Sequence, residues 1–237
     1  MALVKYGGGI VQQSGSIAGN TYARGRFGNY VRARTKPVNP KTSRQSAARI
    51  AIMYLAEQWR ESPMTDAIRL AWETYAQSVS WLNKLGESVT LTGFNMFMRA
   101  NCALLRAGGT IVTAGPTDLG LPAADPTLVV SLASEATQDV TVTYDDTAEW
   151  CDEDNAFMIL EMGQPQNVTR NFFDGPWRFY AAIEGDSVAP PSSPELLLGG
   201  DAYTFVETQK VFWRASIIRS DGRMTTKFTL PSTIVGA

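Results

Sequence analysis

Residues 127–144, TLVVSLASEATQDVTVTY, mark the point at which this chain takes on the pattern of a β protein. Leu128–Leu132 and Val140–Tyr144 are short runs rich in valine, leucine and threonine, and a polar stretch separates them. Runs of this length and composition, bounded by polar residues, predict strands. The sequence therefore predicts two consecutive strands here.

The same pattern continues to the C-terminus. Five further strands are predicted at 157–162, 177–183, 203–206, 211–218 and 224–230. Asp221-Gly222 is a hairpin-turn signal between the last two. Phe212 and Trp213 are adjacent in a predicted strand, so they fall on opposite faces and one of them points into the core. Seven short strands predict an antiparallel β-sandwich over residues 127–237.

Residues 39–108 precede the sandwich and show helical periodicity, which predicts a block of three amphipathic helices. Trp59, Trp72 and Tyr75 lie on their apolar faces and are expected to form a small core. Residues 81–89 are expected to be a loop, and residues 109–126 a Gly/Pro/Ala-rich linker to the sandwich. The expected helix limits are Asn39-Pro40 or Thr42 to Arg60, Ser62-Pro63 or Thr65 onward, and Thr92 to Gly108-Gly109.

Residues 1–38 form an extended, basic, glycine-rich arm. Residues that favour extended structure separate the glycines, so a long ribbon or hairpin is expected, with too few large apolar residues for a core. Its arginines include two pairs, Arg24 with Arg26 and Arg32 with Arg34, in which one residue separates the two members. A strand would place each pair on one face. The candidate partner-binding residues are Arg24, Arg26, Arg32, Arg34, Tyr22, Phe27 and Tyr30.

The charge of the chain is divided unevenly between its halves. Residues 1–115 carry a net charge of +9 and residues 116–237 a net charge of −11, and the first acidic residue is Glu57. This asymmetry indicates a charged partner, or docking of one half on the other half of a neighbouring copy. Docking of the arm on acidic protein is favoured, and contact of the same arginines with nucleic-acid phosphates is the alternative.

Composition argues against an enzyme. The chain has no histidine, so histidine-dependent nucleophiles, bases and metal sites are excluded. There is no phosphate-binding glycine motif, and we expect no catalytic residue, no cofactor and no resident metal. No apolar run reaches the length of a membrane helix and no secretory signal is present, so no membrane contact is expected.

The acidic segment 145–154 and the two cysteines are interpreted as structural features. Residues 145–154 place six carboxylates in ten positions, which we interpret as a solvated loop; calcium binding is the alternative, although the spacing lacks the glycine of a helix-loop-helix calcium loop. Cys102 and Cys151 are expected to be two free thiols, one of them packed.

Several stretches resemble a family of bacteriophage virion structural proteins. They are Ala18–Arg24, Arg32–Pro40, Trp59-Arg60, Ala71-Trp72 and LTGFNMFMRAN at Leu91–Asn101. Val211–Lys227, VFWRASIIRSDGRMTTK, resembles the last hairpin of an immunoglobulin or fibronectin type III-like domain. The resemblance covers most of the chain, and its motifs are structural. It implies an α+β protein with an Ig-like sandwich, located in the virion after synthesis in the host cytoplasm.

These observations lead to one expectation of function and three alternatives. We expect an auxiliary head protein, of the decoration or cement type, that binds the major capsid protein or other virion proteins through its arm and forms a homo-oligomer. A head–tail connector or tail structural protein is an alternative, because such proteins are built from similar structural elements. A nucleic-acid-binding module is a further alternative, and so is a carbohydrate-binding sandwich with Trp150 or Phe173 stacking on sugars.

Overall fold

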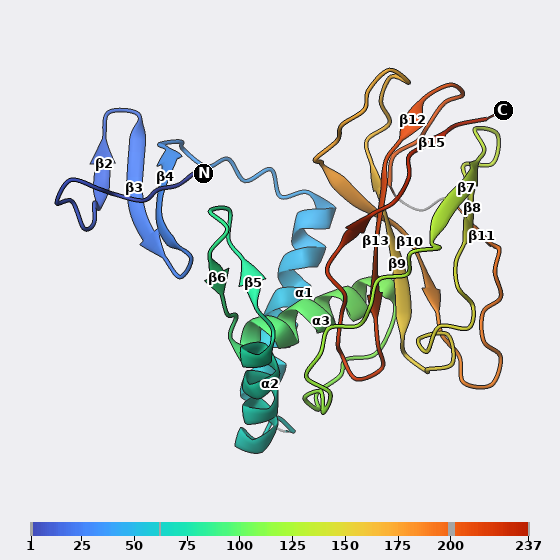
Figure 1. The fold of residues 1–237 in the computed structure, drawn as a ribbon, viewed down its shortest axis with the longest axis horizontal. Helices are drawn as coiled ribbons and strands as arrows, with labels where there is room; N and C mark the ends of the chain where they lie inside the picture. Colours follow the sequence, from blue (N-terminus) through green and yellow to red (C-terminus); the bar gives the residue numbers. More distant parts are fainter. Residues whose placement is uncertain (1, 62, 199–201, 237) are drawn as a thin grey trace.

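A computed structural model describes residues 2–61, 63–198 and 202–236 of the chain. Helices and antiparallel sheets are both present, which confirms the expected mixture of helix and strand. A small N-terminal sheet lies apart, a block of helices follows, and the remaining strands form the largest part of the molecule (Figure 1). No helix in the described part of the chain is long and apolar enough to cross a membrane.

The arm is a four-stranded antiparallel sheet with the order β1-β4-β3-β2. The expected hairpin is present as β3 and β4, which pair from Gly25–Gly28 at the turn to Asn20–Ala33 at the open end. Two shorter strands extend it on either side. The strands are β1 (Ala2–Leu3), β2 (Gly15–Ile17), β3 (Asn20–Gly25) and β4 (Gly28–Ala33).

Three helices follow, and a threonine caps each of them. The hydroxyl oxygens of Thr42, Thr65 and Thr92 accept a hydrogen bond from the backbone N–H three residues later, each at 3.3 Å. Such N-caps satisfy a donor that the helix itself leaves unpaired. The threonine alternatives are therefore the correct helix starts. The helices are α1 (Ser43–Arg60), α2 (Asp66–Ser78) and α3 (Gly93–Ala107).

The expected loop at 81–89 is a short hairpin instead. Strands β5 (Trp81–Leu82) and β6 (Ser88–Val89) pair around a turn. The side chain of Asn83 builds this turn, because its Oδ1 accepts the N–H groups of Leu85 and Glu87 at 2.8 and 2.9 Å. One asparagine thus supplies the turn chemistry that converts a polar loop into a hairpin.

Two antiparallel sheets face each other in the C-terminal half. One has the order β10-β9-β13-β14 and the other β11-β8-β7, and their facing side chains form one apolar core. β12 and β15 pair at one end. The strands are β7 (Val129–Ala133), β8 (Val140–Thr143), β9 (Phe157–Gly163), β10 (Trp177–Glu184), β11 (Glu195–Leu197), β12 (Lys210–Val211), β13 (Trp213–Ile218), β14 (Phe228–Thr229) and β15 (Thr233–Ile234).

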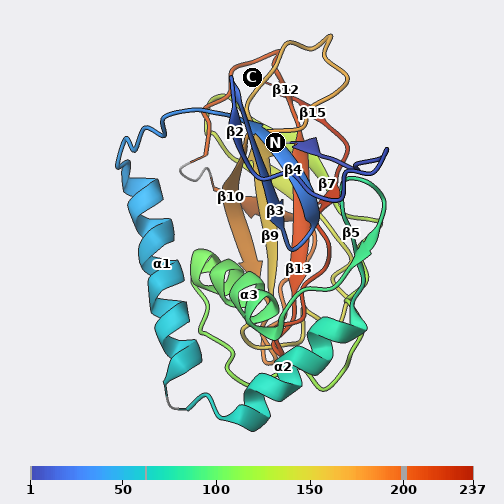
Figure 2. The same ribbon diagram turned by 90° about the vertical axis from the view of Figure 1, so that its left-hand side faces the viewer.

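The four-stranded sheet is covered on both faces. Met158, Leu160 and Met162 of β9 point into the core between the sheets, whereas Phe157 and Ile159 join the core under the helices. Figure 2 shows α3 lying across β9, β10 and β13 on that outer face. Every residue of β9 is buried as a result. The molecule beyond the arm is therefore three layers, helices on sheet on sheet.

The connector at 109–126 packs tightly against the helices and is not an independent spacer. Trp72 Nε1 donates to the Thr113 carbonyl at 2.9 Å, and the buried Asn101 side chain bonds both backbone groups of Val112. A Cβ added at Gly115 would lie 2.7 Å from the Cβ of Ala71, so only glycine fits there. These contacts tie the connector to α2 and α3.

One predicted strand is absent and another is shorter than expected. Residues 203–206 are not a strand. The backbone N–H of Phe205 donates to Gln138 Oε1 at 3.0 Å and its carbonyl accepts from Gln138 Nε2 at 2.8 Å, so a side chain occupies the positions that a neighbouring strand would use. The stretch 224–230 is a strand only at β14, because the Arg99 guanidinium binds the carbonyls of Met224 and Thr225. The structure instead forms β11 from Glu195–Leu197, where no strand was predicted.

The prediction for Phe212 and Trp213 is confirmed. Trp213 is fully buried in the core between the sheets. Phe212 lies outside that core and stacks on Phe173, with their ring centroids 5.4 Å apart. The turn at Asp221-Gly222 is also present, and Gly222 adopts a left-handed φ of 85° there.

Candidate interaction surfaces

None of the described residues of the N-terminal arm, 2–38, is buried. Among described residues, the first one buried is Leu55, near the end of α1. The whole four-stranded sheet and the first two-thirds of α1 therefore form regular hydrogen-bonded structure without a core of their own. A surface of this kind is typical of segments that pack against another molecule.

Two polar contacts hold the arm near the body, and both lie beside the β5–β6 hairpin. The Lys5 ammonium is 2.5 Å from the Glu87 carboxylate, and Arg26 Nε donates to the Thr90 carbonyl at 3.1 Å. The hydrogen bond from Lys5 holds the pKa of the Glu87 carboxyl below its ordinary value. All of these groups are exposed to a large extent, so solvent screens the attraction.

The structure does not gather the four arm arginines on one face. Arg24 pairs with Asn29 in the β3–β4 ladder, whereas Arg32 pairs with Thr21, which places these two arginines on opposite faces of the sheet. Arg26 and Arg34 lie just beyond the ends of β3 and β4. The β3–β4 ladder therefore fixes the facing of Arg24 and Arg32 only, and the expectation that each pair shares one strand face stays a prediction.

The aromatic residues of the arm are also divided between its faces. Tyr22 pairs with Val31 and Tyr30 with Ala23, so the two half-buried tyrosines lie on opposite faces. Phe27 is at the hairpin turn and is 42% exposed. Arg32 and Arg34 are exposed, and neither has an ion-pair partner in the described part of the chain. The arm offers cations and aromatic rings on two sides.

A second surface is a groove of about 1030 Å³ between α1, α3 and the outer face of the four-stranded sheet. Small side chains of α1, Ala47, Ala48 and Ala51, form one wall. Cys102 and Ala103 of α3 form another. The groove is mostly apolar, and it is not predictable from the sequence because its walls come from segments far apart in the chain.

A buried carboxylate lies in the floor of this groove. Glu161 of β9 is 4% exposed, and three cations hold it: Arg106 at 3.3 Å, Arg214 at 2.6 Å and Lys227 at 2.8 Å. Burial raises the pKa of the Glu161 carboxyl, but the hydrogen bonds and charges of Lys227 and Arg214 outweigh it and hold the pKa below its ordinary value. The carboxylate is therefore ionised at neutral pH.

The signal for this cluster in the sequence is one charged residue within an apolar strand, FMILEMG at 157–163. A lone carboxylate at such a position requires a cation partner. The sequence does not identify that partner, because the three cations come from α3, β13 and the segment before β14.

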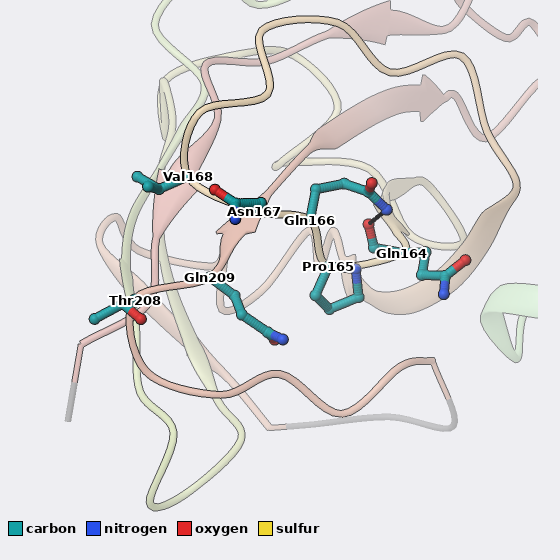
Figure 3. A pocket seen from close by; sticks show the side chains of 7 residues that line it. All are labelled: Gln164, Pro165, Gln166, Asn167, Val168, Thr208 and Gln209. Atoms are coloured by element: carbon teal, nitrogen blue, oxygen red, sulfur yellow. Dashed lines mark hydrogen bonds between the residues drawn. The ribbon is translucent and has the colours of Figure 1, made fainter.

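A smaller cavity of about 520 Å³ lies between two loops at one end of the sandwich (Figure 3). It is lined by Gln164, Pro165, Gln166, Asn167, Val168, Thr208 and Gln209. No charged side chain is among the described residues that line it, and several of its amides already bond neighbouring residues, such as Gln209 Oε1 with the Val206 N–H at 2.9 Å. This cavity is open and polar.

The acidic segment 145–154 is an ordered turn. Arg219 pairs with both Glu149 and Glu153, and the Asp145 carboxylate caps the backbone N–H of Thr147 at 3.0 Å. The described residues contain no group of three or more cysteine or acidic side chains placed to hold a metal ion. The segment is accounted for by its own hydrogen bonds and ion pairs.

The aromatic residues considered for sugar stacking are not available. Trp150 is 3% exposed and packs against Tyr144 at 5.6 Å. Phe173 is half-buried between Trp177 and Phe212. Both rings are already packed within the protein.

The two cysteines are free thiols, as expected. Cys151 is buried, and burial together with four nearby aspartates raises its pKa to about 12. Cys102 lines the groove and is half-buried, and burial raises its pKa as well. Cys102 is thus the more accessible thiol.

No protein-family model, curated protein or solved structure matches this chain.

Proposed function

We propose that this chain is a structural protein of a bacteriophage particle, an auxiliary head protein that attaches through its N-terminal arm. The observation that carries the proposal is the absence of any buried residue between positions 2 and 54. Ordering a chain costs about 1–2 kcal/mol per residue in conformational entropy. A partner surface that buries this sheet supplies the stabilisation that the arm lacks alone.

The charge of the arm indicates the kind of surface. The first 56 residues carry nine basic residues and no acidic one. Complementary charge increases association rates and selects among partners. An acidic protein surface, such as that of the major capsid protein, fits an arm of this kind.

The strand order of the body supports an immunoglobulin or fibronectin type III-like sandwich. In our proposal, the three-stranded sheet β7-β8-β11 takes the places of strands A, B and E of that architecture, and β10-β9-β13-β14 those of C′, C, F and G. Domains of this class are widespread as surface modules. In our proposal the sandwich is displayed outward while the arm attaches to the particle.

The test is incorporation into particles. A tagged full-length protein should cosediment with phage heads in the cells that produce them, and a variant lacking residues 2–41 should remain unbound. A variant with Arg24, Arg26, Arg32 and Arg34 all changed to glutamine should bind at least tenfold more weakly.

Normal cosedimentation of the truncated protein would rule out the arm mechanism. Immunogold labelling at the neck or tail would favour the connector alternative. Binding of the purified protein to DNA, lost steeply with added salt, would favour the nucleic-acid alternative.

A further inference from the structure

The groove between α1, α3 and the sheet carries excess positive charge. Its lining includes Arg106, Arg178 and Lys227, and Glu161 is the one anion among the described residues that line it. Both oxygens of Glu161 already have partners: Oε1 bonds Arg106 and Lys227, and Oε2 bonds Arg214 and Lys227. The groove therefore has more cations than its own carboxylate neutralises.

Aromatic rings hold these cations in fixed positions. The guanidinium of Arg106 lies 5.0 Å from the ring centre of Phe179, that of Arg214 lies 4.7 Å from Trp177, and that of Arg178 lies 3.9 Å from Tyr203. Stacking of this kind fixes the plane of a guanidinium. Arg106 and Arg214 each use one N–H group on Glu161 and Arg178 uses one on the Ala202 carbonyl, which leaves the other N–H groups of each guanidinium for a carboxylate. The occupant that matches the groove has aliphatic side chains for the apolar walls and carboxylates for the cations.

Residues 184–198, EGDSVAPPSSPELLL, have this chemistry. The segment joins β10 to the end of β11 and contains Glu184, Asp186 and Glu195 but no lysine or arginine. It exposes aliphatic side chains to solvent: Val188 is 90% exposed, Leu196 54% and Leu198 74%. Asp186 caps the N–H groups of Val188 and Ala189, and Glu195 accepts the Tyr144 hydroxyl, so the exposed Glu184 and the aliphatic side chains form the surface that is complementary to the groove.

We propose that the groove of one copy of this chain binds residues 184–198 of a second copy. The interface uses two different surfaces, so it is head-to-tail, and repetition of it produces a closed ring or an open chain. The arm of a neighbour does not match the groove, because both are basic. This contact is independent of the arm and joins copies to one another, whereas the arm attaches them to the particle.

Cys102 allows a direct test, because this native thiol lines the groove. A Val188→Cys variant should form intermolecular crosslinks with a short bismaleimide, and adding Cys102→Ala should abolish them. Cys151 is fully buried, so its thiol should not react with the maleimide. A matched control is Val168→Cys, which places a thiol on an exposed loop outside residues 184–198 and should give no Cys102-dependent crosslink.

Light scattering gives a second, independent measurement. The wild-type protein should form oligomers that weaken with added salt, and Glu184→Lys should weaken them by about tenfold while leaving the fold intact, since Glu184 is exposed and has no ion-pair partner in the described residues. Deletion of residues 2–41 should leave this association unchanged, which separates the result from that of the arm.

Three outcomes would overturn the proposal. One is a wild-type protein that stays monomeric at all concentrations and salts. Another is a crosslink that persists after Cys102→Ala. The third is protection of Cys102 from maleimide by a short duplex DNA, which would identify a nucleic acid as the occupant.

Discussion

The N-terminal sheet and the sandwich are both antiparallel, yet they are stabilised in different ways. In the sandwich, Trp213, Leu160 and Val142 are fully buried between two sheets, and β9 is covered on both faces. In the arm, the β3–β4 ladder is equally regular, but no residue of it is buried. Backbone hydrogen bonds are present in both regions and apolar burial in only one. Burial, and not hydrogen bonding, is the dominant favourable term in folding, so we expect the body to fold without the arm.

The largest effect should come from the core under the helices. Trp72 is fully buried, packs edge-on against Phe97 at 5.7 Å and also binds the Thr113 carbonyl. Trp72→Ala should lower the free energy of unfolding by about 4 kcal/mol, as measured by urea denaturation. The matched arm variant is Tyr22→Ala, which should leave the urea midpoint unchanged. Equal losses in the two variants would mean that the arm is as well packed as the body.

A second, pH-dependent effect is expected from Glu161. Replacing it with glutamine leaves three cations without their carboxylate, and should destabilise the protein by about 3 kcal/mol at pH 7. Because the folded pKa of Glu161 is lowered, its stabilisation is complete above the unfolded pKa, which is about 4.3. That stabilisation is lost as the pH falls through the folded pKa.

The measurement is urea denaturation of both proteins between pH 7 and pH 3. The stability difference between wild type and Glu161→Gln should narrow below about pH 4. Other carboxylates with lowered pKa values, such as Glu153, are common to both proteins and cancel in the difference. A difference that stays constant over this range would show that the Glu161 charge does not stabilise the fold.

Features that depend on residues close together in the sequence were predicted correctly more often than features that depend on residues far apart. Thr42, Thr65 and Thr92 were identifiable as caps because a cap acts on a backbone group three residues away. By contrast, the loss of the strand at 203–206 depends on Gln138, which is 67 positions away, and Glu161 is held by cations 53 to 66 positions away. Nothing in the local pattern of either region encodes those partners.

The candidate site shows the same limit. The composition of the arm predicted a basic, aromatic extended segment, and the structure forms one. The placement of Arg24 and Arg32 on opposite faces was not predictable, because it depends on the register in which β3 pairs with β4. The groove was not predictable at all, since α1, α3 and the sheet contribute to it only after folding.

The smallest effect on stability should come from removing the arm itself. Deletion of residues 2–41 removes the whole N-terminal sheet but no buried side chain, and it leaves the cap of α1 at Thr42 in place. The side-chain contacts that are lost, Lys5 with Glu87, Arg26 with the Thr90 carbonyl and Asn39 with Arg49, join exposed groups. The urea midpoint of the truncated protein should therefore equal that of the full chain, and Trp72→Ala should lower both midpoints by the same amount. A clear drop on truncation alone would show that the arm packs on its own body, and the unburied surface on which the proposed attachment depends would then be already occupied.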